Sequence, residues 1–201
     1  MQKLVECVEQ ESLKYEVFFK LIISTGMRRG ECCGIKWSDI NWQEYSIKIS
    51  RNIVKVSHED ILEKEPKTAA GNRKVYISKS MDMLLGEFRS ECEWFARQYI
   101  GRELHDGDFI FIRDNSLPMT PNSFTFRFNK ILAKHDLPKT LTVHSLRHSN
   151  ASLLISQNVD VRTVAGLLGH SQASTTLDIY SHSFDKTKKA ASEKLGAVLD
   201  I

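Results

Sequence analysis

The chain lacks any long uninterrupted run of apolar residues. None approaches the roughly 18 to 20 residues that a membrane-spanning helix requires. The N-terminus carries an acidic residue early, at Glu6, and no signal-peptide core follows it. We therefore expect a cytoplasmic protein without a membrane partner. Internal repeats, low-complexity tracts and a convincing linker are also missing. The length of 201 residues allows one large domain or two small ones.

Cysteines are few and the net charge is small. The four cysteines contain no C-x-x-C pair, which argues against zinc-ligand spacing and against a secreted disulfide framework. Reduced, mostly structural thiols are expected. The net charge is +3 and the pI about 8.6, below the value of about 9 that flags a nucleic-acid-binding domain. A surface for a polyanion must therefore come from local clustering of lysine and arginine.

The residues that are present suit a globular protein with a core, because 41% are hydrophobic and 26% are charged. Apolar spacing predicts a helix over residues 2–24 and a short helix from Arg29 to about Lys36. Partial alternation and β-branched residues predict strands over residues 45–56 and 74–78. These strands predict a small antiparallel sheet with Lys67 in its turn region.

Capping residues divide the remainder of the chain into helices. The predicted helix starts are Ser80, Thr120 with Pro121 at the first helical position, Thr142, Asp160, Ser174 and Asp185. Gly169 closes the helix that Asp160 begins. The predicted fold class is α+β: a mainly helical single domain with a small antiparallel sheet near residues 45–78.

Two arginines and a histidine stand out by their placement. His144 and Arg147 are three residues apart, so a helix presents them on one face. Arg28 lies where one predicted helix ends and another begins. A cation there opposes the helix dipole and is tolerated when an anion binds the same helix end. Glu31, in the same turn, suits the dipole and is expected to orient an arginine.

Three further residues complete a candidate site. His170 follows Gly169 just beyond a helix end, and a C-capping role is its alternative. Tyr180 can attack phosphorus and hold it covalently, although a tyrosine on that helix is usually a core residue. Lys67 alone is an ordinary loop lysine. Arginines grip phosphate with a fork of donors and histidines move protons near neutral pH, so the set suggests phosphodiester cleavage without a metal.

A metal site is the rival interpretation of the same histidines. His144 and His148 have the i, i+4 spacing of helical metal ligands, and His182 could join them in a metal-dependent nuclease or hydrolase. The glutamate of an H-E-x-x-H motif is missing between the first two histidines. No third ligand has fixed spacing, so we disfavour this interpretation.

In chain order the candidate residues are Arg28, Lys67, His144, Arg147, His170 and Tyr180. This order, with the motifs around it, resembles the catalytic domain of the tyrosine recombinase (phage integrase) family over essentially the whole chain, most closely the integrases of bacterial mobile elements. The resembling segments are Thr25–Glu31 with Lys36–Ile40, Pro66–Thr68 with Arg73–Val75, His144–Ser152, Leu167–Ser171 and Ser174–His182. Ser145 and Asn150 depart from the residues most frequent in the family.

The resemblance implies a site-specific DNA recombinase that cleaves and rejoins strands through a 3′-phosphotyrosyl intermediate, with no metal, ATP or other cofactor. Tyr180 is then the nucleophile and His144 the general base. Arg28 and Arg147 clamp the phosphate, Lys67 protonates the leaving oxygen and His170 hydrogen-bonds a phosphate oxygen. Glu31 supports an arginine from behind.

The resemblance also implies partners and a domain plan. We expect residues 1–183 to form the catalytic core and residues 184–201 a tail helix, which packs on its own domain or exchanges between protomers of a homotetramer on double-stranded DNA. The N-terminal core-binding and arm-binding domains of the family are expected to be absent from this chain. Strand relaxation of the type IB topoisomerase kind and a non-catalytic DNA-binding protein remain as alternatives.

Overall fold

The computed structural model describes residues 1–56, 61–65, 71–113 and 116–169, together with residues 192, 193, 195, 196 and 199. Its helices are α1 (Gln2–Val8), α2 (Leu13–Thr25), α3 (Arg29–Cys33), the 3-10 helix η1 (Trp37–Asp39), α4 (Lys79–Phe95), the π-helical turn η3 (Ala96–Ile100), α5 (Pro121–Lys134), α6 (Val143–Ser156) and α7 (Val161–Leu168). Its strands are β1 (Ile40–Asn41), β2 (Ser46–Ile49), β3 (Asn52–Lys55), β4 (Ile61–Lys64) and β5 (Arg73–Tyr76). The predicted α+β class, mainly helical with a small antiparallel sheet, is confirmed.

The described strands form two antiparallel sheets. One has the order β1-β2-β5, with Ile47 opposite Val75, and the other pairs β3 with β4. The prediction of one strand over residues 45–56 is therefore wrong in detail. The strand is interrupted at Ser50 and Arg51. There the Arg51 guanidinium donates to the Gly34 carbonyl and to the Asp39 carboxylate. The two halves of the segment consequently pair with different neighbours.

Two helix boundaries also differ from the sequence prediction. The single helix expected over residues 2–24 is two helices, because Ser12 is extended and starts α2 as its N-cap. The long helix α4 is capped by Ser78, whose Oγ accepts from the Met81 N–H at 3.2 Å, and not by Ser80. In contrast, the predicted caps Thr120, Thr142 and Asp160 all accept backbone N–H bonds at their helix starts.

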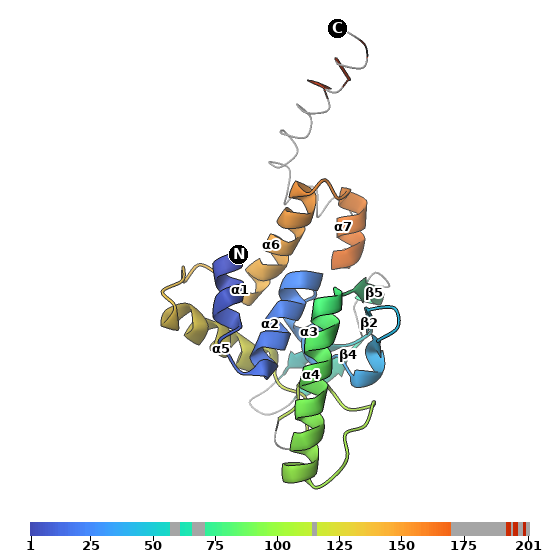
Figure 1. The fold of residues 1–201 in the computed structure, drawn as a ribbon, viewed down its shortest axis with the longest axis vertical. Helices are drawn as coiled ribbons and strands as arrows, with labels where there is room; N and C mark the ends of the chain where they lie inside the picture. Colours follow the sequence, from blue (N-terminus) through green and yellow to red (C-terminus); the bar gives the residue numbers. More distant parts are fainter. Residues whose placement is uncertain are drawn as a thin grey trace.

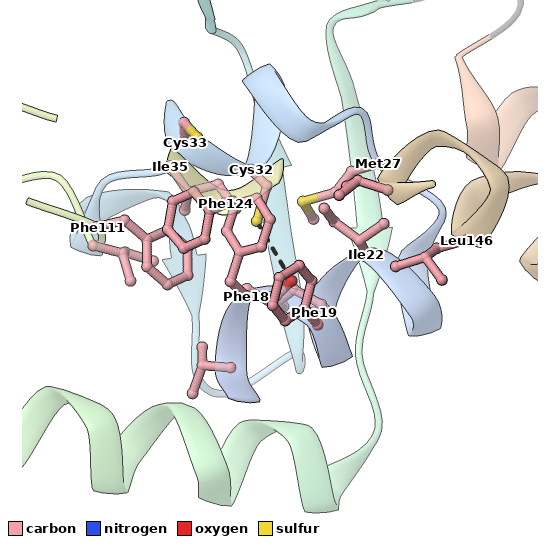
Figure 2. Close-up of a cluster of buried hydrophobic side chains, with 14 of the residues drawn as sticks. Phe18, Phe19, Ile22, Met27, Cys32, Cys33, Ile35, Phe111, Phe124 and Leu146 are labelled. Carbon is pink, nitrogen blue, oxygen red and sulfur yellow. Dashed lines mark hydrogen bonds between the residues drawn. The ribbon is translucent and has the colours of Figure 1, made fainter. Parts of the chain in front are cut away.

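Helix α2 runs through the middle of the molecule and contacts α1, α3, α4 and α6 (Figure 1). Its fully buried residues Phe18 and Phe19 pack with Phe111 and Phe124, and the rings of Phe18 and Phe124 are stacked with centroids 3.5 Å apart (Figure 2). Each such aromatic burial contributes about 2 to 3 kcal/mol. This cluster holds the middle of α2 in the core, and the C-terminal end of α2 leads into the candidate site.

Helices α6 and α7 carry a second, smaller apolar cluster. Val164 and Leu168 of α7 pack against Ala151 and Ile155 of α6. The pair lies at one end of the molecule in Figure 1, and α7 also contacts β5. The apolar packing of α7 is thus largely with α6, while other interactions join its C-terminal end to the rest of the protein.

Candidate phosphate-binding cleft

The turn between α2 and α3 places Arg28 at the entrance of a cleft. Gly26 ends α2 in the left-handed conformation, with φ at +66°, which only glycine adopts without strain. Met27 is fully buried beside Ile22 and Leu146 (Figure 2). Arg28 then forms the N-cap of α3 in extended conformation. Its side chain remains 43% exposed, so the guanidinium faces the cleft and solvent.

Glu31 holds Arg28 at two points. Its carboxylate accepts the Arg28 backbone N–H at 2.7 Å and the Arg28 Nη1 at 2.7 Å. Burial would raise the pKa of Glu31, but hydrogen bonds and charge from Arg73, aided by Arg28, hold that pKa below its usual value. Glu31 is therefore a buried carboxylate anion at the start of α3, where the helix dipole favours negative charge.

Helix α6 supplies the other side of the cleft. Thr142 and Ser145 form a reciprocal capping box at its start. His144 and Arg147 follow one turn apart. Arg147 is 3% exposed and donates to the Gly26 carbonyl at 2.7 Å and to the Leu168 carbonyl at 2.6 Å. The second arginine is therefore locked between α2 and α7.

The cleft that these residues share has a volume of about 360 Å³. Arg28, His144 and Arg147 line it, as the sequence predicted for a common site. The remaining walls come from the α2–α3 turn, α3, β3 and the starts of α5 and α6: Met27, Arg29, Gly30, Asn52, Ile53, Val54, Lys55, Pro121, Asn122 and Val143. The described lining residues include Arg28, Arg29, Lys55 and Arg147 and no carboxylate, so the described part of the cleft is positively charged.

Burial and the positive charge of the cleft both affect the pKa of His144. Burial first, and then the positive charges of His148, Arg147, Arg28 and Arg29, lower its pKa below the usual 6.5. The neutral imidazole is therefore the favoured form near pH 7. A neutral imidazole accepts a proton, which is the property a general base needs.

Arg73 is a functional candidate that the sequence interpretation did not assign. Its side chain, 7% exposed, pairs with Glu31 through two nitrogens, Nη2 at 2.9 Å and Nη1 at 3.2 Å. Arg73 opens β5 two residues before the buried Val75. Side chains two apart in a strand share a face, so an arginine in phase with a buried valine was the available signal.

Three predicted site residues, Lys67, His170 and Tyr180, lie outside the described residues, as do the predicted helix starts Ser174 and Asp185. The described chain reaches Gly169, which is left-handed with φ at +67° and closes α7 as predicted. Its carbonyl oxygen lies 3.5 Å from Nη2 of Arg28. The residue before His170 in the sequence thus lies beside the cleft.

Within the described ranges, no group of three His, Cys, Asp or Glu side chains gathers as a metal site would require. The rings of His144 and His148 lie 4.6 Å apart in an edge-to-face arrangement. His182, the third histidine of the metal interpretation, is outside the described residues. None of the described helices has both the length and the apolar character that crossing a bilayer demands.

Fold and cleft together define an α+β protein whose cleft offers two guanidinium groups and a neutral imidazole, an arrangement suited to an oxyanion such as phosphate. Its family follows from the sequence profile named "Phage integrase family", which matches residues 1–187. The chain belongs to this family, and the resemblance inferred from the motifs is confirmed.

Individual proteins agree with that assignment. The chain is 30% identical to a tyrosine recombinase XerC-like protein of Caldanaerobacter subterraneus subsp. tengcongensis, covering 97% of this chain and 52% of that protein. It is 27% identical to the ICEBs1 integrase of Bacillus subtilis, covering 98% and 53%. The chain thus spans about half the length of these curated relatives.

The fold also matches solved structures. The Tn1549 transposon integrase, in complex with a circular intermediate DNA, superposes with a TM-score of 0.81 at 22% identity, covering 96% of this chain and 63% of that one. The XerA recombinase gives a TM-score of 0.69 at 20% identity. At these identities the likeness establishes the fold.

Proposed function

We propose that this chain is the catalytic part of a site-specific DNA recombinase that cleaves and rejoins strands through a phosphotyrosyl intermediate. The observation that carries the proposal is the convergence of Arg28, His144 and Arg147, from distant parts of the sequence, on one positively charged cleft. Family membership supports it, and so do relatives named as recombinases and integrases. The solved complex of the Tn1549 integrase with a circular intermediate DNA supports double-stranded DNA as the partner.

In the proposed reaction the phenolic oxygen of Tyr180 attacks the scissile phosphorus while the P–O5′ bond breaks. The products are a 3′-phosphotyrosyl link and a free 5′-hydroxyl. His144 takes the phenol proton, and Lys67 gives a proton to the departing 5′ oxygen. Because the new phosphodiester link conserves the bond energy, attack by a 5′-hydroxyl reverses the step without ATP.

The remaining side chains stabilise charge. Arg28 and Arg147 donate to the non-bridging oxygens as negative charge grows on them, and each such donor is worth about 10²- to 10³-fold in rate by analogy with oxyanion-hole donors. His170 donates to one of the same oxygens. Glu31 keeps the Arg28 guanidinium in place. None of the described residues that line the cleft is a carboxylate, which agrees with this electrostatic role.

A covalent trapping experiment tests the proposal. The full chain is incubated with a pool of short duplexes that have a randomised centre and a nick in one strand, so that the cleaved fragment diffuses away. The expected result is a protein–DNA adduct that survives denaturant and maps to Tyr180 by mass spectrometry. Tyr180→Phe serves as the matched control. An equal adduct yield from Tyr180→Phe would show that the nucleophile is assigned wrongly.

The duplex sequence recovered from the adducts is called the selected duplex. A second assay with this duplex distinguishes strand exchange from relaxation. The names of the relatives favour exchange. Joining of a second, labelled duplex to the trapped strand is the expected product. Religation of the original strands alone, with relaxation of a supercoiled plasmid, would favour the topoisomerase-like reaction instead.

The proposal also covers how the protein assembles on DNA. We place the catalytic core at residues 1–183 and assign residues 184–201 as a tail helix that couples protomers of a homotetramer on DNA. Deletion of residues 184–201 tests this by light scattering of the complex with the selected duplex. Loss of the tetramer with an unchanged melting temperature supports coupling between protomers. Unchanged assembly and unchanged stability would remove the assignment.

A further inference from the structure

The C-terminal end of α7 is held by three different arginines. Three consecutive carbonyl oxygens each accept from one of them. Arg73 Nε donates to Leu167 at 2.7 Å, Arg147 Nη2 donates to Leu168 at 2.6 Å, and Arg28 Nη2 donates to Gly169 at 3.5 Å. Two of these arginines belong to the candidate site, and the third begins β5.

These bonds matter because a helix leaves its last carbonyl oxygens without intrahelical partners, and that end carries the negative pole of the helix dipole. The apolar face of α7 packs mainly on α6. The hydrogen bonds from the arginines therefore contribute much of the interaction between the C-terminal end of α7 and the remainder of the protein. This end of α7 lies near β5 (Figure 1).

Arg73 is not placed to bind a phosphate itself. Its side chain is 7% exposed. Four donations occupy its guanidinium: Nε to Leu167, Nη1 to both Glu31 and the Gly71 carbonyl at 3.3 Å, and Nη2 to Glu31. A guanidinium has five N–H donors, so its partners among the described residues leave one, and Arg73 does not line the cleft.

Through Glu31, Arg73 acts on Arg28. The carboxylate of Glu31 is 3% exposed and is shared between the two arginines, with Oε1 accepting from Arg28 at 2.7 Å. Without Arg73 the carboxylate would keep, among the described residues, only its bonds to Arg28, whose side chain is 43% exposed. The two Nη donors of Arg73 therefore fix the Glu31 carboxylate. The carboxylate in turn fixes the direction of the Arg28 guanidinium.

We propose that Arg73 is a positioning residue for strand cleavage, which sets both the Arg28 guanidinium and the end of α7 that leads into His170. The proposal rests on the function proposed above. It assigns Arg73 to the chemical step, because misplacement of a catalytic group by about 1 Å can cost 10²-fold in rate. DNA affinity is expected to change little, since Arg73 makes no contact in the cleft.

The test uses Arg73→Lys in the full chain. Lysine keeps a positive charge beside Glu31 but lacks the planar fork that spans two partners. In single-turnover cleavage of the selected nicked duplex at saturating protein, Arg73→Lys is expected to be about 10- to 100-fold slower than wild type. Its affinity for the same duplex is expected to stay close to wild type, as for a residue that acts only in the transition state.

Arg51→Lys is the matched control. Arg51 also pairs with a buried carboxylate, Asp39, that caps a short helix through the Lys36 N–H, and it also donates to a carbonyl oxygen, that of Gly34. It does not line the cleft. Arg51→Lys is expected to cleave at the wild-type rate. The cleavage rate and the melting temperature are compared between the two variants. If the loss of cleavage rate per degree of lost melting temperature is the same in both, Arg73 has only a structural role and the proposal is overturned.

A second measurement does not depend on DNA. Hydrogen–deuterium exchange of the peptide containing Leu167 and Gly169 is expected to be faster in free Arg73→Lys than in wild type and unchanged in Arg51→Lys. Unchanged exchange in Arg73→Lys would contradict the proposal. If the wild-type chain forms no adduct, the proposed function fails on its own, and this exchange comparison still decides whether Arg73 holds the end of α7.

Discussion

The guanidinium of Arg147 donates a 2.7 Å hydrogen bond to the carbonyl oxygen of Gly26, 121 residues earlier in the chain. The same side chain donates to Leu168, so it joins the ends of α2 and α7 as well as lining the cleft. Arg28, its counterpart across the cleft, is far more exposed. The two arginines should therefore be equivalent for cleavage and unequal for stability.

Alanine substitution separates these two roles. Arg147→Ala removes the donor that the Gly26 and Leu168 carbonyl oxygens have among the described residues. Each buried unsatisfied group costs about 1 to 3 kcal/mol. Arg28→Ala removes an exposed partner of Glu31, worth about 1 kcal/mol or less. Both variants should lose about 10²- to 10³-fold in adduct formation. Urea unfolding and adduct yield measure the two effects, and equal destabilisation by both substitutions would contradict the structural role of Arg147.

Gly26→Ala should damage the turn that carries Arg28. Gly26 has φ at +66°, and an added Cβ would lie 2.6 Å from Leu168 Cδ2 and 2.9 Å from Asn150 Oδ1. Strain and crowding should cost about 2 kcal/mol or more. A fall of roughly 4 to 8 °C in melting temperature is expected for a chain of this length, together with slower adduct formation.

Gly86→Ala is the control for that substitution. Gly86 lies in α4, and an added Cβ would meet nothing within 4 Å. Alanine in a helix interior is favoured over glycine by about 0.5 to 1 kcal/mol, so Gly86→Ala should raise the melting temperature slightly and leave cleavage unchanged. A stabilising Gly26→Ala would show that the turn can relax around the new methyl group.

Local signals explain what the sequence predicted correctly. Thr120, Thr142 and Asp160 cap the helices that they were expected to start, because a cap bonds to N–H groups only two or three residues away. The i, i+3 spacing likewise placed His144 and Arg147 together. The family motifs added Arg28, which no local rule could bring to the same cleft.

Interactions between distant segments explain what the sequence did not reveal. The break near Ser12 leaves Glu11 buried against Arg127 and Lys134 of α5, and those partners lie more than a hundred residues away. The split of residues 45–56 depends on Arg51 reaching Asp39. The pairing of Arg73 with Glu31 joins β5 to α3. Periodicity within a window cannot report any of these contacts.

The Glu31 carboxylate should make stability depend on pH. Its pKa is held below the usual 4.5, chiefly by Arg73 acting against the effect of burial. A carboxyl group with a lowered folded-state pKa contributes stability above its unfolded pKa, and that stability is lost as the pH falls through the folded value. Glu31→Gln should therefore be less stable than wild type at pH 7, by about 2 kcal/mol, and the difference should shrink toward pH 3. Urea unfolding at a series of pH values measures it, and a constant difference would argue that Glu31 is not ionised in the folded protein.

The imidazole of His144 should titrate below pH 6.5 in the free protein. Burial lowers its pKa, and the charges of His148, Arg147, Arg28 and Arg29 lower it further. Because the neutral form is the proton acceptor, adduct formation should persist as the pH falls to 6.5 and decline only as the pH passes through the lowered value.

His148→Gln tests the charge contribution to that titration. Removing the neighbouring imidazole, whose ring centroid lies 4.6 Å from that of His144, should move the His144 midpoint upward while burial keeps it below 6.5. Lys134→Gln is the control, because Lys134 pairs with Glu11 and is not among the charges that bear on His144. Proton NMR of the imidazole resonances follows each midpoint without DNA. A wild-type midpoint above 6.5 would contradict the lowered pKa. A midpoint above about 7 would leave His144 largely protonated at neutral pH, and the general-base role would then have to pass to another group.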